Sequence, residues 1–274
     1  MKENIRNGLR ILLTALFVIS TGLLLRQFAD NMGGQDAYAE ALAIASGNGG
    51  LEKRKPEPEQ REAPAEQALV WVPAAVEGDP MVEEMAAIDL AGLREVNGDV
   101  VGWIRIPDTK IDYPLMQGQD NDYYLNHTWD RQSNSVGSVY LEHLNSADLT
   151  DYNTILYGHN MKDGSMFAAL SRFASEQFWE KHPYVYITTD AGVYRYEIFS
   201  SYKADLDSIT YGLSFQRTET KEMFLRYIRE SSSIHPEITL DPNDRILTLS
   251  TCSGAGYSTR WVVHARLKMI QLQQ

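Results

Sequence analysis

Cysteine is the scarcest residue of the chain, with one copy among 274 residues. A single thiol cannot close a disulfide within the chain, and it excludes the zinc sites that are built from several cysteines. Basic residues are fewer than acidic ones. The chain has 25 lysines and arginines and 37 aspartates and glutamates, so its formal net charge is −12. A nucleic-acid-binding protein usually has the opposite balance. These shortages raise the question of what the single thiol does.

The rest of the composition is that of a globular protein. Hydrophobic residues make up 43% of the chain and charged residues 23%, whereas disordered chains are poorer in hydrophobic residues. The length suits one or two ordinary domains, and the sequence contains no internal repeat.

The N-terminal segment predicts a membrane anchor. Lysine and arginine residues within residues 1–10 precede an uncharged apolar run over residues 11–25. As a helix this run is about 22 Å long, and with its neighbours at both ends it approaches the ~30 Å hydrocarbon core of a bilayer. The basic residues would hold the N-terminus in the cytoplasm and the rest of the chain outside the cell. We therefore assign residues 1–29 to a cytoplasmic tip and a single signal-anchor transmembrane helix.

A cleaved signal peptide is the alternative for this segment. The sequence Ala37-Tyr38-Ala39 has the small–x–small pattern of a cleavage site. It lies farther beyond the apolar run than such sites usually do, so we favour an uncleaved anchor.

Residues 30–80 have the composition of a spacer. They are rich in glycine, proline, alanine and glutamate, and no helical or strand period persists through them, although residues 36–45 could form a short helix. We therefore expect a flexible extracellular linker over 30–80 and one folded domain over 81–274.

Short strands dominate the expected structure of this domain. Apolar patterning predicts a mainly β fold in which the strands form a closed or nearly closed barrel and helices lie in the connections. Helices are expected over 81–96, 163–173, 175–179 and 218–230, and strands over 100–106, 111–115, 136–141, 154–157, 184–188, 193–202, 245–251 and 261–269.

The single cysteine, Cys252, follows the β-rich run 246–251 and precedes a loop of small residues. A thiol at the end of a strand, beside a loop with little bulk, could be reached by a substrate. The alternative is a packed core cysteine, because free cysteine is among the most buried residue types. Catalysis would need a base or a positive neighbour, since a thiol with a pKa near 8.5 is only a few per cent thiolate at pH 7.

Among the histidines, His159 is the best candidate for that neighbour. It follows the apolar strand 154–157 across Gly158, which places it at the rim of the expected barrel. His182 and His235 each precede a proline and are expected at the surface, and His264 lies within the last strand, either in the core or facing solvent.

Arg260 follows Cys252 at the entry to the last strand. If the two flanking strands are antiparallel neighbours, Arg260 and Cys252 can face each other across the connection. A guanidinium there could stabilise the oxyanion of a tetrahedral intermediate. The alternative is an ordinary arginine in solvent.

Several segments, taken together and in order, resemble those of the class B sortases. The two most specific are Tyr157-Gly158-His159-Asn160-Met161 and Thr248-Leu249-Ser250-Thr251-Cys252. The others are residues 102–106, 111–114, 120–125, 163–167 and 260–264. The resemblance covers about residues 90–270, and an N-terminal anchor with a spacer is also the layout of that family.

The resemblance implies a membrane-anchored cysteine transpeptidase of Gram-positive bacteria. It implies an eight-stranded sortase-type β-barrel with an N-terminal helix and added helices in the connections. Such enzymes cleave the C-terminal sorting signal of a secreted protein after a threonine and pass the acyl group to an amino group, usually of a peptidoglycan precursor. The implied partners are therefore secreted proteins that carry a sorting signal, the amine acceptor and the membrane. No cofactor and no metal are implied.

By the same resemblance, Cys252 would be the nucleophile, and His159 would protonate the leaving amine and then deprotonate the incoming one. Arg260 would hold the substrate and its oxyanion. The positions that match the peptide groove are Asn121, Leu125, Tyr157, Ser250 and Thr251. Several class B members have an acidic residue just after the cysteine, whereas this chain has Ser253 and Gly254, which puts substrate contacts from that loop in doubt.

Three other functions remain as alternatives. A pilin-polymerising sortase would use a lysine side chain as acceptor, and a hydrolytic cysteine peptidase would use water. A non-enzymatic surface binding module would merely pack Cys252 in its core.

Overall fold

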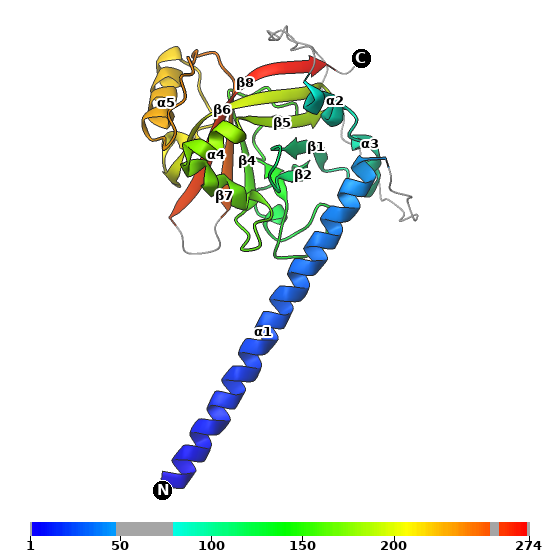
Figure 1. Ribbon diagram of the computed structural model, residues 1–274, viewed down its shortest axis with the longest axis vertical. Coiled ribbons are helices and arrows are strands. Elements are labelled where there is room, and N and C mark those ends of the chain that lie inside the picture. Colours follow the sequence, from blue (N-terminus) through cyan, green and yellow to red (C-terminus); the bar gives the residue numbers. More distant parts are fainter. Residues whose placement is uncertain (1, 48–78, 253–257, 273–274) are drawn as a thin grey trace.

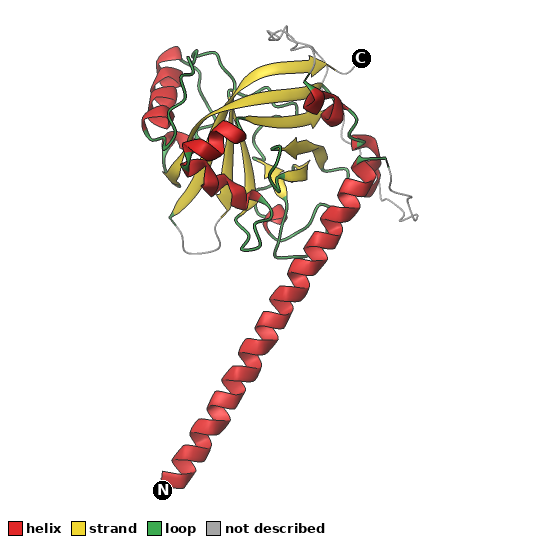
Figure 2. Ribbon diagram, in the orientation of Figure 1, coloured by secondary structure: helices red, strands yellow, loops and turns green. Residues whose placement is uncertain are grey.

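The computed structural model describes residues 2–47, 79–252 and 258–272. The described strands form one closed barrel in the order β1-β2-β3-β4-β7-β8-β6-β5, which confirms the expected eight-stranded, mainly β fold (Figure 2). The strands are β1 Val100–Arg105, β2 Asp112–Met116, β3 Val139–Leu141, β4 Asn153–His159, β5 Tyr184–Thr189, β6 Gly192–Asp205, β7 Ile246–Cys252 and β8 Thr259–Leu272.

Helices lie before the barrel and in its connections. They are α1 Lys2–Ala45, α2 Pro80–Ala86, α3 Leu90–Val96, η1 Tyr123–Leu125, η2 Phe167–Ala174, α4 Glu176–Lys181, η3 Ile209–Tyr211 and α5 Thr218–Glu230. The single helix expected over 81–96 is two helices, because Asp89 caps a new one by accepting the Gly92 N–H at 2.8 Å.

Helix α1 is longer than the expected anchor and leaves the domain as one straight rod (Figure 1). Residues 30–45, expected as the start of a flexible linker, continue this helix and pack on the domain. The physical reason is a stripe of small and apolar residues at helical spacing, Ala37, Ala41 and Ile44, all of which are buried. Residues 48–78 of the expected linker lie outside the described residues.

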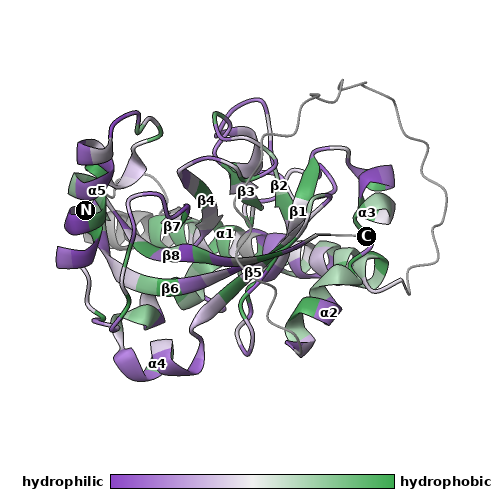
Figure 3. Cartoon of the chain, turned by 90° about the horizontal axis from the view of Figure 1, so that it is seen from above, coloured by the Kyte–Doolittle hydropathy of each residue, from purple (hydrophilic) through white to green (hydrophobic). Residues whose placement is uncertain are grey.

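The barrel interior is filled by alternating residues of the strands. Leu156, Leu249 and Val263 from β4, β7 and β8 point inward and belong to the largest buried cluster, together with Phe167 of η2. Hydrophobic residues concentrate on the strands, and hydrophilic ones on α4, α5 and the connecting loops (Figure 3). Because side chains alternate along a strand, the residues between these inward positions lie on the outer face of the barrel.

Strands β4 and β7 run parallel, and their register determines where the strand ends meet. Asn153 pairs with Ile246 at one end of the ladder and His159 pairs with Cys252 at the other. Strand β8 runs antiparallel to β7 on its other side, and Ser250 pairs with Val262. The end of β4, the end of β7 and the start of β8 therefore lie side by side.

Gly158→Ala tests the packing beneath these strand ends. An added Cβ would lie 2.8 Å from Cγ of Phe167, so overpacking should lower the free energy of unfolding by about 1–3 kcal/mol. Gly98→Ala is the matched control, because nothing lies within 4 Å of its Cβ position. Denaturant unfolding of both variants measures the difference, and an equally small effect at both positions would contradict this packing.

Candidate active site

His159 and Cys252 end neighbouring strands and are register partners. Backbones of adjacent strands lie about 4.8 Å apart. Partners on adjacent strands share one face of a sheet, so position 252 lies on the outer face that carries His159. The structure therefore brings together the two residues that the sequence selected separately. The loop of small residues after Cys252, residues 253–256, lies outside the described residues.

Arg260 joins this pair from the other side. It lies in β8, half-exposed, and pairs with Ala204 of β6. The β7–β8 register, continued by two residues beyond Ser250 and Val262, sets position 252 opposite Arg260. A thiol, an imidazole and a guanidinium at adjoining strand ends are the groups that nucleophilic cysteine chemistry requires.

The imidazole of His159 is oriented by the last residue of η1 and by the loop that follows it. Its Nε2 lies 2.7 Å from the carbonyl oxygen of Leu125. A carbonyl can only accept, so Nε2 carries the hydrogen and Nδ1 is the nitrogen that gains or loses a proton. Gly137 lies against the ring, since a Cβ there would be 2.9 Å from Cδ2 of His159. Leu125, expected in the substrate groove, thus also holds the histidine through its backbone.

The turn that carries Leu125 is fixed by a carboxylate. Asp120 accepts the backbone N–H groups of Asp122 and Tyr123, each at 2.9 Å, in the turn that leads into η1. These hydrogen bonds lower the pKa of Asp120. The carboxylate therefore remains ionised, and the turn keeps its shape, at neutral pH.

A buried carboxylate that the sequence analysis missed joins two expected groove residues. Oε2 of Glu142 accepts hydrogen bonds from Nδ2 of Asn121 at 2.7 Å and from Oη of Tyr157 at 2.9 Å. Tyr157 lies two residues before His159 on β4, hence on the same face, and pairs with Ser250 of β7. An acidic residue directly after the apolar strand 139–141 was the signal available for Glu142.

Tyr211 of η3 is a second residue that the sequence did not reveal. Its Oη lies 3.0 Å from Oγ of Ser250, across 39 positions of sequence. No local pattern reports such a contact. Thr251, in contrast, alternates to the other face of β7, where its Oγ1 accepts the N–H of Trp261 at 3.1 Å. The structure therefore brings together Asn121, Tyr157 and Ser250 but does not bring the side chain of Thr251 to them.

Three other histidines, His182, His235 and His264, lie away from the paired strand ends. His264 is fully buried, and this burial lowers its pKa to about 3. It is held between the hydroxyls of Thr248 at 2.9 Å and Tyr202 at 3.2 Å. His235 is exposed as expected. The surface position expected for His182 is wrong, because its ring is buried and Nδ1 bonds to the carbonyl oxygen of Pro107 at 3.0 Å.

Comparison with known proteins identifies related sequences. The family model described as the sortase domain matches residues 104–268. The sortase B of Listeria monocytogenes is 39% identical over 164 residues, which is 60% of this chain and 67% of that protein. The sortase B of Staphylococcus aureus is 34% identical over 177 residues, which is 64% of this chain and 72% of that protein.

Solved structures show the same relationship. A Staphylococcus aureus sortase B–substrate complex aligns with a TM-score of 0.64 and 31% identity, and covers 69% of this chain and 87% of that one. The sortase B of Bacillus anthracis aligns with a TM-score of 0.67 and 31% identity, and covers 89% of this chain and 100% of that one.

A cysteine transpeptidase that anchors proteins to the cell wall is the class of enzyme that these findings define. The chain belongs to the sortase family, and its relatives place it in class B. This family acts at the cell surface. The resemblance that the sequence motifs suggested is thereby confirmed.

Glu142→Gln tests the carboxylate that joins the expected groove residues Asn121 and Tyr157. The amide cannot accept from Asn121 and Tyr157 and also from the His143 ring, which lies 2.8 Å from Oε1. We expect the free energy of unfolding to fall by about 1–3 kcal/mol, and KM for the peptide substrate to rise more than kcat falls. Glu84→Gln is the control, because its carboxylate is exposed. Steady-state kinetics with an unchanged KM would contradict a role in the groove.

Proposed function

We propose that this sortase cleaves a C-terminal sorting signal after its threonine and transfers the acyl group to an amino group of a peptidoglycan precursor. The observation that carries the proposal is the register of three strands. It sets Cys252 beside His159 on one side and opposite Arg260 on the other. The motifs around these three positions resemble those that carry the catalytic residues of class B sortases.

The first half of the proposed reaction forms a thioester. The thiolate of Cys252 attacks the carbonyl carbon of the threonine, and the guanidinium of Arg260 stabilises the oxyanion that results. Nδ1–H of the His159 imidazolium then protonates the leaving amine as the C–N bond breaks. The tether from Nε2 to Leu125 keeps Nδ1 as the nitrogen that transfers this proton.

The second half reverses these roles. The incoming amine attacks the thioester carbon, and neutral His159 takes its proton at Nδ1. Collapse of the intermediate breaks the C–S bond and returns the thiolate and the imidazolium. Atoms and charges balance over both halves, and no cofactor takes part in these steps.

Relatives support the proposed substrate classes. One solved structure is a sortase B–substrate complex, and another is sortase B complexed with triglycine. A glycine peptide carries the kind of amino group that the second half consumes. These partners are carried over to this chain by the shared fold and motifs.

The proposed location is a single-pass anchor with a cytoplasmic N-terminus and an extracellular catalytic domain. One helix among the described residues, within 12–45, is long and apolar enough to cross a membrane. A signal sequence passes the same test. However, cleavage after Ala39 would remove Tyr38, whose phenol donates to the carbonyl oxygen of Gly137 in the domain. That contact favours the uncleaved anchor.

The deciding experiment is a peptide-library cleavage assay on the full chain in detergent, read by mass spectrometry. The amines supplied are a glycine peptide and a lysine side chain. Aminolysis by the glycine peptide supports the proposal. Exclusive use of lysine would favour the pilin-polymerising sortase, and hydrolysis alone would favour the peptidase.

Cys252→Ala should abolish cleavage, because no other thiol exists in the chain. In the parent enzyme, mass spectrometry should detect one acyl group per chain after incubation with substrate, and none in the variant. Circular dichroism should show an unchanged fold. Residual cleavage within about tenfold of the parent rate, a difference of only ~1.4 kcal/mol in activation free energy, would rule out this nucleophile.

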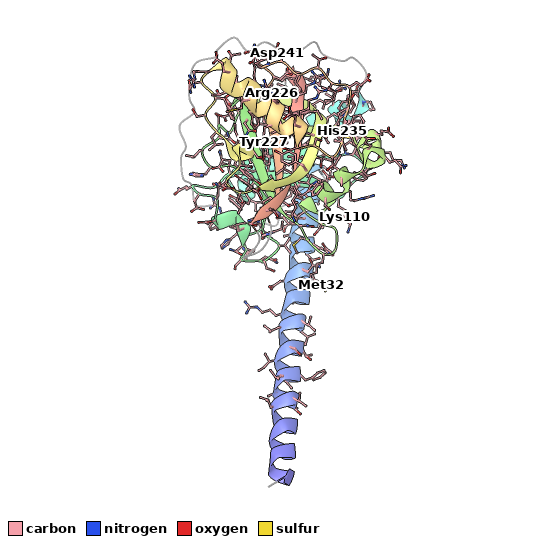
Figure 4. The ribbon with its side chains drawn as sticks, turned by 90° about the vertical axis from the view of Figure 1, so that its left-hand side faces the viewer. Met32, Lys110, Arg226, Tyr227, His235 and Asp241 are labelled. Atoms are coloured by element: carbon pink, nitrogen blue, oxygen red, sulfur yellow. The ribbon has the colours of Figure 1, made fainter. Side chains whose placement is uncertain are left out.

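Arg260→Lys should lower kcat about 10²–10³-fold, the usual cost of losing an oxyanion donor. A lysine keeps the charge but not the planar fork of donors. Arg226→Lys is the matched control, because Arg226 is exposed on α5 at the far end of the domain (Figure 4). Equal rates for the two variants would show that Arg260 is a bystander.

A further inference from the structure

The docked half of α1 contacts the segment that orients His159. Nε1–H of Trp129 donates to the carbonyl oxygen of Ala37 at 2.7 Å, and Nδ2 of Asn134 donates to that of Asp30, also at 2.7 Å. Gly34 lies against Val136, because a Cβ at Gly34 would be 2.8 Å from its side chain. The helix thus holds the loop between η1 and β3 over about two turns.

Tyr38 lies at the centre of this contact. Its Oη donates to the carbonyl oxygen of Gly137 at 2.5 Å and lies 3.2 Å from Oγ of Ser138. Burial raises the pKa of Tyr38, so its phenol remains protonated and able to donate. Gly137 is the residue that packs on the His159 ring, and a Cβ there would also meet the carbonyl oxygen of Leu125 at 2.7 Å.

The same side chain supports the segment on the other side of the histidine. The Tyr38 ring meets the Tyr113 ring edge to face, with centroids 5.1 Å apart. Oη of Tyr113 accepts the backbone N–H of Met166 at 2.9 Å. Met166 has a φ of 53° and forms a β-bridge with Asn160, the residue after His159. Its strained backbone requires such support.

A second contact from α1 reaches that segment. Nε2 of Gln35 donates to Oδ2 of Asp163 at 3.1 Å. Partial burial opposes ionisation of Asp163, but hydrogen bonds from Ser165, Gln35 and Asn31 outweigh it and lower the pKa to about 2. Lys110 donates to the carbonyl oxygen of the same aspartate at 2.7 Å. Figure 4 shows Lys110 close to the level at which α1 meets the domain.

We propose that Tyr38 is a positioning residue for His159, so that the docked half of the anchor helix belongs to the catalytic apparatus. The phenol restrains the Gly137 carbonyl, Gly137 restrains the imidazole plane, and the adjoining Leu125 carbonyl holds Nε2–H. Without the hydroxyl, the imidazole can rotate away from the Leu125 carbonyl. The neutral ring can then also adopt the tautomer that carries its hydrogen on Nδ1. The inference rests on the proposed role of His159 in proton transfer.

The test uses the full chain in lipid nanodiscs and the variant Tyr38→Phe, which keeps the ring and its packing on Tyr113. Tyr186→Phe is the matched control, because it also removes a buried phenol hydrogen bond, from Oη to Asp79 at 2.9 Å, but on β5 away from the strand ends. Two readouts are needed. The first is kcat and KM across pH, and the second is the tautomer of His159 by ¹⁵N NMR of histidine-labelled protein.

For Tyr38→Phe we expect kcat to fall about tenfold, which corresponds to ~1.4 kcal/mol of activation free energy, with KM within twofold of the parent. The fraction of Nε2–H tautomer should also fall, and the limbs of the pH profile should move. Tyr186→Phe should keep kcat, the pH profile and the tautomer even if its thermal stability drops.

Two outcomes would overturn the proposal. One is a parental kcat and tautomer in Tyr38→Phe. The other is an equal loss of kcat in both tyrosine variants, which would mean that stability alone is responsible. The variant His159→Asn separates this inference from the proposed function. If His159→Asn remained active, His159 would have no catalytic role. The tautomer measurement on Tyr38→Phe would still report whether Tyr38 orients the ring.

Discussion

Parallel pairing of β4 with β7 is the constraint on which the rest of the molecule depends. Parallel strands end at the same edge of a sheet, so the residues that close β4 and β7, His159 and Cys252, become neighbours. A shift of one residue in this register would move Cys252 to the barrel interior, because side chains alternate between faces. Leu156 and Leu249, which pair inside the barrel, fix the register through their burial.

Around that ladder, polar groups are held by buried partners rather than by solvent. Glu142 joins Asn121 to Tyr157, and the Leu125 carbonyl holds His159. Buried hydrogen bonds of this kind cost free energy when broken, so they specify one arrangement of side chains. These polar side chains on the outer face of β4 and β7 are therefore held in one arrangement by the protein itself.

Much of the fold and part of the site could be predicted from local sequence. Strand-like runs before His159 and Cys252 placed both at strand ends, but the pairing of those strands is non-local and was not predicted. Only the motif resemblance suggested that the two residues act together. The docking of α1 was missed because small residues such as Ala37 and Ala41 give a weak amphipathic signal. The proline after His182 suggested a surface turn. Tertiary packing nevertheless buries the imidazole of His182, which bonds to the carbonyl oxygen of Pro107.

One uninterrupted helix joins the apolar half of α1 to its docked half, and in Figure 1 the end of β7 and the start of β8 face the same side as the N-terminal half. The helical phase therefore sets the direction in which the catalytic domain faces around the axis of α1. Each residue inserted between the two halves would turn the domain by about 100° and lift it by about 1.5 Å. Removing seven residues would nearly restore this direction while bringing the domain about 10 Å closer to the apolar half of α1. The distance of the domain from the apolar half of α1 and the direction of the strand ends are thus separate variables, both set by the length of one helix.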